Sequence, residues 1–417
     1  MEVKPKINRR EFVQAFGMVA GASMIASGMP WLSTVMASDP VKTIKIGMIG
    51  VGSRGSLLLQ YLMETPGVMI SCFCDNYEPH LARTQEKLPH ANAYRDHRDM
   101  IEKEELDAVV IATPLNEHAH ITIDCFEAGL HVFCEKSMAK TYEECNDMIL
   151  AREKAGKILT IGHQRMFSVK YQQAYKMIKE GKIGKPTQIR AYWHRNNDWR
   201  RDVPDPSLER KINWRLYHEY SLGLMTELCS HQVQVANQVL GENPSEVWGA
   251  GSTNYWKDGR EVYDNINLVF KYPGGTHFIY DSMTSNKKYG YEEQILGPKG
   301  TLELEAGKFW SEFPPPAPAI LQLINNLEHD LFEAIPIGGA SWVPDDPVNN
   351  RGEYILDKVM DDDGTRMMLE AFVANVRDNR IILEDTKQGF YSGIASIMGF
   401  EAMWENRIVR WPEGLAL

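Results

Sequence analysis

The stretch Ile44–Gly55, which reads IKIGMIGVGSRG, decides the fold of this chain. Its first half is an apolar run of strand length, and its second half has glycines at the spacing G-x-G-x-x-G. In such a loop Gly50 permits a tight turn, Gly52 lets the backbone approach a pyrophosphate, and Gly55 allows a helix to pack closely on the strand. Unpaired N–H groups at the start of that helix attract phosphate. The stretch therefore predicts a dinucleotide-binding strand–turn–helix unit.

Asp75 closes the next apolar run, VMISCFCD. A carboxylate at this position accepts hydrogen bonds from the adenosine ribose and repels a 2′-phosphate. No arginine follows Asp75 immediately, so the sequence favours NAD over NADP. Ser53 and Arg54 complete the glycine loop and join the predicted cofactor contacts.

The alternation of strand and helix continues to residue 161. Short apolar runs alternate with helical patterns, which predicts parallel strands joined by helical crossovers. The expected fold is α/β, with a doubly wound parallel sheet in an NAD-binding Rossmann domain over residues 42–162. The apolar runs are IKIGMIG, VMISCFCD, LDAVVIAT, LHVFCEK and ILTIG.

The pattern changes after residue 163. Helical patterns near residues 168–180 and 223–240 flank a strand, TQIRAYWHR, and a long irregular stretch. Five strand-like runs follow with turn signals and no helices between them, which predicts an open, mostly antiparallel sheet. Residues 163–417 are therefore expected to form an α+β domain for substrate binding and oligomerisation. The segment PPPAP at 314–318 is predicted to be a stiff linker.

Residues 1–37 resemble an export signal. Arg9 and Arg10 precede an uncharged run over residues 12–38 that is rich in Ala, Gly and Met. This is the pattern of a twin-arginine signal, so we expect a periplasmic or otherwise exported protein carried by the twin-arginine machinery. The alternatives are a cytoplasmic amphipathic N-terminus and an uncleaved anchor. The run is too weakly hydrophobic and too interrupted by glycine for a good membrane span.

The composition excludes some classes of function. The chain has a net charge of −11, and without the four basic and two acidic residues of the leader the charge is −13. This acidity argues against nucleic-acid binding, which needs a basic stripe. The six cysteines lack metal-type spacing and are too few for a disulfide framework, so they are predicted to be small buried apolar residues. No metal site is predicted.

Polar residues follow the later strands of the predicted sheet. Ligands bind at the carboxyl ends of such strands. Lys136 stands at one of these ends, where a lysine whose pKa is lowered by burial can hold a substrate hydroxyl and pass a proton. From its position alone, His118 is a helix-start residue. The predicted cofactor contacts from this edge are Thr113, Pro114, Asn116, His118 and Glu135.

The glycine loop, Asp75, A-T-P-x-x-x-H, E-K and G-H-Q-R follow one another in an order that resembles the Gfo/Idh/MocA family of oxidoreductases. The resemblance covers nearly the whole chain after the leader. It implies a nucleotide-binding domain, an open-sheet domain and assembly into a homodimer or homotetramer. The family's E-K-P motif, whose loop often contains a cis bond, appears here as Glu135-Lys136-Ser137.

The family's second signature, roughly D-x-G-x-H-x-x-D, corresponds here to ELCSHQVQ at residues 227–234. His231 is retained, Glu227 replaces the first Asp, and Gln234 replaces the last. Glu227 and His231 are four residues apart, which places them on one helix face. The resemblance implies that His231, assisted by Lys136, takes the proton of a secondary alcohol while hydride leaves its carbon for nicotinamide.

The irregular stretch HRNNDWRRDVPDPSLERKINWRLYHEY supplies aromatic rings and cations. These suit a sugar ring, and they suit a contact between subunits equally well. The resemblance also implies substrate contacts near the junction of the two domains. The predicted substrate-binding residues are Arg165, Tyr171, Trp199, Arg200, Trp214 and Arg215.

Export of a protein that binds NAD predicts a retained cofactor, because the twin-arginine route carries folded proteins and the periplasm supplies little free NAD. We expect an NAD-dependent oxidoreductase that acts on a secondary hydroxyl of a sugar or glycoside, at C3, and recycles NAD in place. One alternative is redox-assisted glycoside hydrolysis by oxidation, elimination, addition and reduction. The H-G-L-G-P-type segment of the NAD-dependent α-N-acetylgalactosaminidases is absent, which favours the oxidoreductase. The other alternative is a non-catalytic NAD-binding family member, which the departures at Ser137 and Gln234 keep open.

Overall fold

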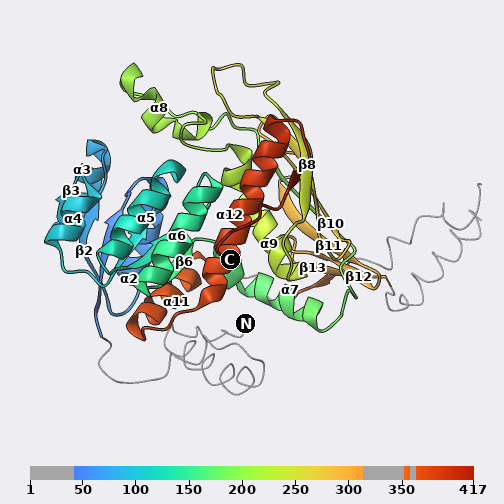
Figure 1. Ribbon diagram of the computed structural model, residues 1–417, viewed down its shortest axis with the longest axis horizontal. Coiled ribbons are helices and arrows are strands. Elements are labelled where there is room, and N and C mark those ends of the chain that lie inside the picture. Colours follow the sequence, from blue (N-terminus) through green and yellow to red (C-terminus); the bar gives the residue numbers. More distant parts are fainter. Residues whose placement is uncertain (1–41, 313–351, 357–362) are drawn as a thin grey trace, which may run out of the picture.

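The computed structural model describes residues 42–312, 352–356 and 363–417. The predicted twin-arginine segment and the proline linker at 314–318 lie outside the described residues. Two sheets make up the molecule, one with helices on both faces and one with helices on a single face (Figure 1).

The first sheet has six parallel strands in the order β3-β2-β1-β4-β5-β6. This confirms the predicted doubly wound sheet. The strand order reverses between β1 and β4, and the carboxyl ends of strands at such a point form a ligand-binding crevice. The strands are β1 (Ile44–Ile49), β2 (Val68–Cys74), β3 (Asn92–Tyr94), β4 (Ala108–Ile111), β5 (His131–Cys134) and β6 (Leu159–Ile161).

One helix on this sheet, α6 (Tyr142–Ala155), begins and ends at residues that the sequence marks. The side chain of Thr141 accepts from the Glu144 N–H, and the Glu144 carboxylate accepts from the Thr141 N–H, so α6 starts with a capping box. It ends at Gly156, which is left-handed. The helices are α2 (Ser53–Glu64), α3 (Glu78–Lys87), α4 (His97–Lys103), α5 (His118–Glu127) and α6 (Tyr142–Ala155).

The second sheet has nine strands in the order β14-β13-β12-β11-β7-β10-β9-β8-β15. Neighbours are antiparallel except β7 and β10, which confirms the prediction of an open, mostly antiparallel sheet. The strands are β7 (Gln188–His194), β8 (Glu246–Ser252), β9 (Asn265–Lys271), β10 (His277–Met283), β11 (Tyr291–Gly297), β12 (Gly300–Glu303), β13 (Lys308–Ser311), β14 (Glu353–Tyr354) and β15 (Val409–Arg410).

Helices cover one face of this second sheet. The helix α12 packs on α9 and on β8, and burial alternates along β9 and β10, so the opposite face is exposed. Trp248 is one of the large apolar side chains on the exposed face. The helices of this half are α7 (Val169–Lys179), α8 (Glu209–Ile212), α9 (Ser230–Leu240) and α12 (Leu383–Trp404).

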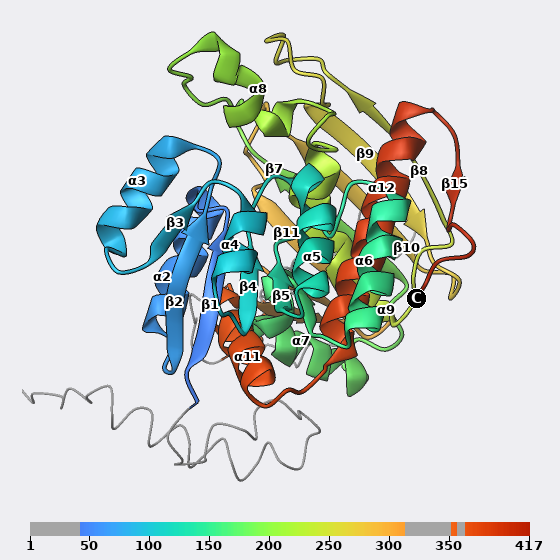
Figure 2. The ribbon, with the colours of Figure 1, turned by 60° about the vertical axis from the view of Figure 1, so that its left-hand side comes forward.

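One C-terminal helix returns to the first sheet. The helix α11 (Thr365–Arg377) packs against α2 and β1, and Figure 2 shows it below the first sheet. Its buried side chains Leu369 and Phe372 belong to the same apolar core as Ile46 and Met48 of β1. The predicted domain boundary between residues 162 and 163 assigns α11 to the second domain, although this helix packs on the first sheet.

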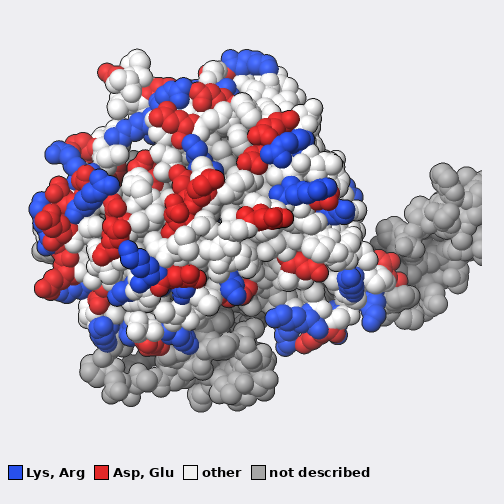
Figure 3. All heavy atoms as spheres, in the orientation of Figure 1, with Lys and Arg blue, Asp and Glu red and all other residues white. Residues whose placement is uncertain are grey.

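Burial and surface charge complete the description. All six cysteines are buried and free, as predicted. No helix in the described part of the chain has the length and apolar character needed to cross a membrane. Acidic and basic side chains are interspersed on the face shown in Figure 3, and no basic stripe runs across that face.

Candidate active site

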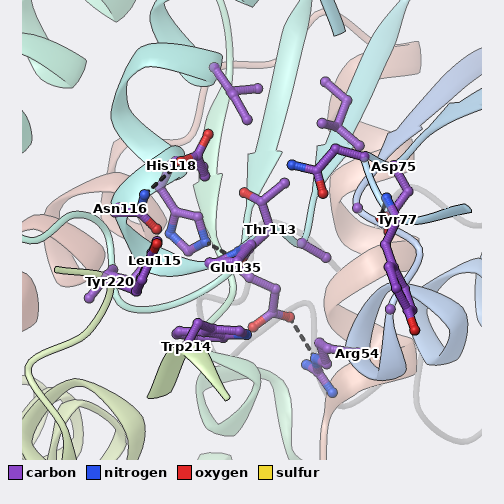
Figure 4. A pocket seen from close by; sticks show the side chains of 18 of the residues that line it. Arg54, Asp75, Tyr77, Thr113, Leu115, Asn116, His118, Glu135, Trp214 and Tyr220 are labelled. Carbon is purple, nitrogen blue, oxygen red and sulfur yellow. Dashed lines mark hydrogen bonds and ion pairs between the residues drawn. The ribbon is translucent and has the colours of Figure 1, made fainter. Parts of the chain in front are cut away.

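A cleft of about 980 Å³ lies where the two halves of the chain meet. It is lined by the glycine loop, by residues at the carboxyl ends of β2, β4 and β5, and by residues between 201 and 231 of the second half. In the view of Figure 4, Asp75 and Tyr77 lie at one end, and Trp214 and Tyr220 lie toward the other. The crevice of the first sheet is therefore closed over by side chains of the second half.

The glycine loop has the shape that a dinucleotide needs. Gly50 has φ of 85°, and a Cβ on Gly55 would lie 2.0 Å from the Gly50 carbonyl oxygen. Only glycine at both positions lets α2 start directly against the turn. Gly52 precedes α2, and no side chain caps the first N–H groups of that helix. Those groups can receive the pyrophosphate of NAD.

Asp75 lines the cleft at the end of β2. Its Oδ2 accepts from the Val51 N–H at 3.0 Å and lies 3.1 Å from Nδ1 of His80. Its Oδ1 accepts from the Tyr77 N–H at 2.9 Å. A carboxylate offers about four acceptor positions, so capacity for a ribose hydroxyl remains.

The loop after β4 contributes Thr113, Pro114 and Asn116 to the cleft lining. His118 also borders the cleft, but its ring is buried between two carbonyl groups. Its Nδ1 lies 2.8 Å from the Ser137 oxygen, and its Nε2 lies 3.1 Å from the Thr113 oxygen. His118 therefore ties the loop after β4 to the loop after β5.

An ion pair joins two sides of the cleft. The Arg54 Nε of the glycine loop donates to Glu135 Oε1 at 2.7 Å, and Figure 4 shows the two side chains pointing toward each other. Glu135 is buried, and Arg54 is its cation. The pair fixes the glycine loop against the end of β5.

Lys136 follows Glu135 and reaches across to the second half of the chain. Its Nζ donates to the carbonyl oxygens of Thr226 at 3.1 Å and Glu227 at 2.9 Å. The Lys136–Ser137 peptide bond is cis. Burial lowers the pKa of Lys136, opposed by the nearby carboxylates. An ammonium has three N–H bonds, and two are used here, so one remains for a substrate oxygen.

Glu227 lies in a π-helical turn. The helix predicted near 223–240 consists of this turn, Met225–Cys229, followed by α9. The Glu227 carboxylate accepts from Arg215 Nε at 2.7 Å. Burial acts to raise the pKa of Glu227, but Arg215 and Lys136 outweigh burial, and the pKa stays below its ordinary value. A charged Glu227 therefore balances the cations beside it.

His231 stands in the first turn of α9 and lines the cleft together with Lys136 and Glu227. Its ring centroid lies 5.9 Å from that of His163 and 5.8 Å from that of Trp193. Burial, followed by the positive charge of Lys136, lowers the pKa of His231 well below its ordinary value. A neutral imidazole beside an ammonium group can accept a proton from a hydroxyl held between them.

These surroundings predict the pH dependence of the reaction. Because the pKa of His231 is well below 6.5, its neutral form persists through the range in which a free histidine titrates. We expect kcat/KM to stay level around pH 6.5 and to fall only at more acidic pH. The pKa of Lys136 is lowered from 10.5, so the alkaline fall begins below that pH. A pH profile of kcat/KM tests both limbs, and an acidic fall centred near pH 6.5 would contradict this environment for His231.

Two of the six predicted substrate residues line the cleft, Trp214 and Arg215. The Arg215 guanidinium lies 4.1 Å from the Trp214 ring centroid while its Nε holds Glu227. The pair offers an aromatic face and a cation from the second half of the chain to whatever occupies the cleft.

Arg165 and Tyr171, predicted as substrate contacts, are not among the residues that line the cleft. The Arg165 guanidinium pairs with Glu293 at 2.7 Å and Glu305 at 3.2 Å. The Tyr171 hydroxyl oxygen lies 2.7 Å from the Glu293 carboxylate and 2.6 Å from the Glu305 carboxylate, and its single O–H donates to one of the two. All of this lies within the second half, where Arg165 and Tyr171 are buried. Arg165 and Tyr171 therefore share the same two carboxylates, Glu293 and Glu305, inside the second half.

Trp199 and Arg200, also predicted as substrate contacts, lie outside the cleft lining as well. Arg200 pairs with Asp258 and with Glu209. Trp199 packs against a small buried cluster that contains Leu216. These contacts hold the irregular stretch to the second half of the chain.

Comparison with known proteins agrees with the fold. The family description "Oxidoreductase family, NAD-binding Rossmann fold" matches residues 44–163, and "GFO/IDH/MocA C-terminal domain" matches residues 171–303. Inositol 2-dehydrogenase of Salmonella typhimurium is 31% identical over 267 residues, which is 63% of this chain and 74% of the relative. The chain belongs to the Gfo/Idh/MocA family.

Two other proteins are similar to this chain. A 2,7-anhydro-N-acetylneuraminate hydratase of Mediterraneibacter gnavus is 26% identical over 269 residues, covering 64% of this chain and 68% of the relative. The crystal structure of scyllo-inositol dehydrogenase from Lactobacillus casei with NAD(H) and scyllo-inositol superposes with a TM-score of 0.66 at 19% identity. That match covers 88% of this chain and 99% of the dehydrogenase. At this identity the match shows a shared fold.

Sequence reasoning missed several residues of this Gfo/Idh/MocA cleft. Tyr77 and His80 follow Asp75 closely, and that proximity was their only signal. His163 is part of the G-H-Q-R motif, and burial followed by Lys136 lowers its pKa to about 3. Unpredicted residues that line the cleft include Tyr77, His80, Lys211 and Tyr220, whereas His163 is not part of the lining.

Proposed function

We propose that this chain is an NAD-dependent oxidoreductase that acts on a secondary hydroxyl of a sugar or glycoside, at C3, with NAD retained and reoxidised in place by a second sugar or another acceptor. One observation carries the proposal: His231 and Lys136, which has one N–H left for a substrate, both line the cleft that the glycine loop also lines. A general base and a hydrogen-bond donor for one hydroxyl oxygen are what alcohol oxidation requires from the protein.

The residues divide the work on that hydroxyl. His231 accepts the proton, because its imidazole is neutral at physiological pH. Lys136 donates its remaining hydrogen bond to the oxygen and stabilises the negative charge that develops there. Glu227 keeps Lys136 charged and in place. When bound, NAD would supply the ring that accepts the hydride. The loop at Gly50–Gly55 would hold the pyrophosphate of NAD, and Asp75 would hold its adenosine ribose.

Sugar-like substrates are supported by a relative and by the cleft. The Salmonella relative is named for inositol, a ring that carries secondary hydroxyls. Trp214 and Arg215 offer an aromatic face and a cation at the cleft. NAD is favoured over NADP because Asp75 places a carboxylate where a 2′-phosphate would lie.

Export and assembly belong to the same proposal. We propose that Arg9 and Arg10 direct the folded, NAD-loaded chain through the twin-arginine route to the periplasm. A homodimer or homotetramer is expected to form on the exposed face of the second sheet, which carries Trp248. Retention of NAD then allows repeated turnover where little free NAD is present.

A second candidate is redox-assisted glycoside cleavage, in which the sugar is oxidised and later reduced on the same cofactor. One relative is named a hydratase, so the family includes a reaction whose name implies no net oxidation. The same His231 and Lys136 would serve the oxidation and the reduction of this cycle. The two candidates differ in product: a keto-sugar from oxidation, or a free sugar from cleavage.

The test separates these outcomes with one preparation. The chain without residues 1–37 is purified with no added cofactor, and the nucleotide released by denaturation is identified. The native protein is then mixed with a panel of glycosides and followed by nicotinamide absorbance and product NMR. Bound NAD with a 3-keto product is expected. Free sugar without net reduction selects the second candidate, and bound NAD with no change in any sugar would mean a non-catalytic member.

A further inference from the structure

A segment of the second half, residues 198–220, lies along the cleft and is here called the strap. It is held firmly to its own half of the chain. Arg260 donates to the Asp198 carbonyl at 2.7 Å, and the Glu261 carboxylate accepts from the His218 N–H at 2.9 Å. The Asn213 side chain, directly after α8, accepts a hydrogen bond from the N–H of Arg201, which precedes α8, at 2.7 Å. The strap is therefore a braced element.

Two lysines connect the strap to the first half of the chain, one in each direction. Lys140, which precedes α6, donates to the strap carbonyls of His218 at 3.0 Å and Glu219 at 2.7 Å. Lys211 on the strap donates back to the Asn76 carbonyl at 2.6 Å. Its Nζ also lies 5.8 Å from the Tyr77 ring centroid. These contacts close the strap against the first half at two separate points.

The Lys211 contact lies at the adenosine end of the proposed NAD site. Asn76 follows Asp75 directly, and the Tyr77 N–H donates to the Asp75 carboxylate. Asn76, Tyr77 and Lys211 all line the cleft, so the contact forms part of its wall. A dinucleotide that spans from Asp75 to His231 would have this closed wall beside it.

We propose that Lys211 acts as a latch: its bond to the Asn76 carbonyl keeps the strap closed and slows both the entry and the exit of the dinucleotide. This inference rests on the dinucleotide site of the proposed function. The contact between Lys211 and the Asn76 carbonyl, which joins the two halves, would then be a physical cause of the retention of NAD. The acceptor is the main-chain carbonyl of Asn76, which every residue type has. The latch therefore depends on the side chain at position 211.

Dissociation and association of NADH measure the latch directly. NADH is bound to wild-type protein and to K211M, excess NAD is added, and the loss of nicotinamide fluorescence is followed by stopped flow. In K211M we expect both rate constants to rise about fivefold, the effect of about 1 kcal/mol from one exposed hydrogen bond to a charged donor. The dissociation constant should stay about the same, because a latch changes the path and leaves the bound contacts intact.

Three comparisons decide the outcome. K211R keeps a donor for the Asn76 carbonyl and should exchange NADH like wild type, and K182M, on an exposed turn, should do the same. If only dissociation accelerates and affinity falls, Lys211 is a direct ligand of the nucleotide and the latch is wrong. Unchanged rates in K211M also overturn it. Sugar oxidation does not enter this measurement, so a chain that exchanges NADH as expected but oxidises no sugar would refute only the proposed function.

Discussion

Replacing His231 with alanine, or Lys136 with methionine, should lower the rate of sugar oxidation by roughly 10²–10⁴-fold while bound NAD stays in place. His231 is not one of the proposed cofactor contacts, so its loss should leave NAD bound. Its neutral ring is the proposed acceptor of the hydroxyl proton. Lys136 holds its position through two carbonyl groups and offers one hydrogen bond to the substrate oxygen. The double variant should lose little more than either single one, since both residues act on one hydroxyl.

The readout for these variants is kcat together with the nucleotide content of each purified protein. H90A, on an exposed turn away from the cleft, serves as the control and should oxidise sugars at the wild-type rate. Wild-type rates in both H231A and K136M would show that the site is assigned wrongly. Loss of nucleotide from either variant would instead place that side chain among the cofactor contacts.

Replacing Arg165 with methionine should lower the free energy of unfolding by about 3–5 kcal/mol. The variant leaves the carboxylate of Glu293, whose side chain is 1% exposed, without the cation that lies 2.7 Å away. Glu305, the second partner, keeps Lys170 at 3.0 Å, so Glu293 carries most of the penalty. Chemical denaturation measures the loss, and the R165M/E293Q variant should recover part of it because the buried charge is gone.

A different result for R165M would support the predicted role of Arg165 as a substrate contact. If the variant keeps wild-type stability and raises KM for the sugar, Arg165 reaches the substrate after all. K170M gives the matched comparison, because it removes the more exposed cation of the same network and should cost far less stability.

The first half of the fold could be predicted because its signals are local. The glycine spacing at Gly50–Gly55 and the alternation of strands with helices each lie within a few dozen residues of sequence. The return of α11 to the first sheet could not be predicted, because nothing in its helical pattern says which sheet it covers. Leu369 and Phe372 would suit any apolar face, and only the folded chain places them against β1.

The candidate site was predictable to the same extent. Lys136 follows a strand and His231 belongs to a motif, so both could be found by position, and the structure brings them into one cleft. The ion pairs of Arg165 could not be predicted, because its partners lie far from it in the sequence, Glu293 in β11 and Glu305 in the turn after β12. Lys211 had no signal, because its acceptor is a main-chain carbonyl at Asn76, which sequence does not mark.

The transfer of deuterium from sugar to bound nucleotide tests the central claim most directly. A glycoside deuterated at C3 is mixed with the NAD-loaded protein, and the nucleotide released by denaturation is examined by mass spectrometry. We expect deuterium on the nicotinamide of the wild-type protein and none on that of H231A over the same time. Unlabelled nucleotide from wild-type protein, with every sugar of the panel at saturating concentration, would contradict oxidation at C3 on this cofactor.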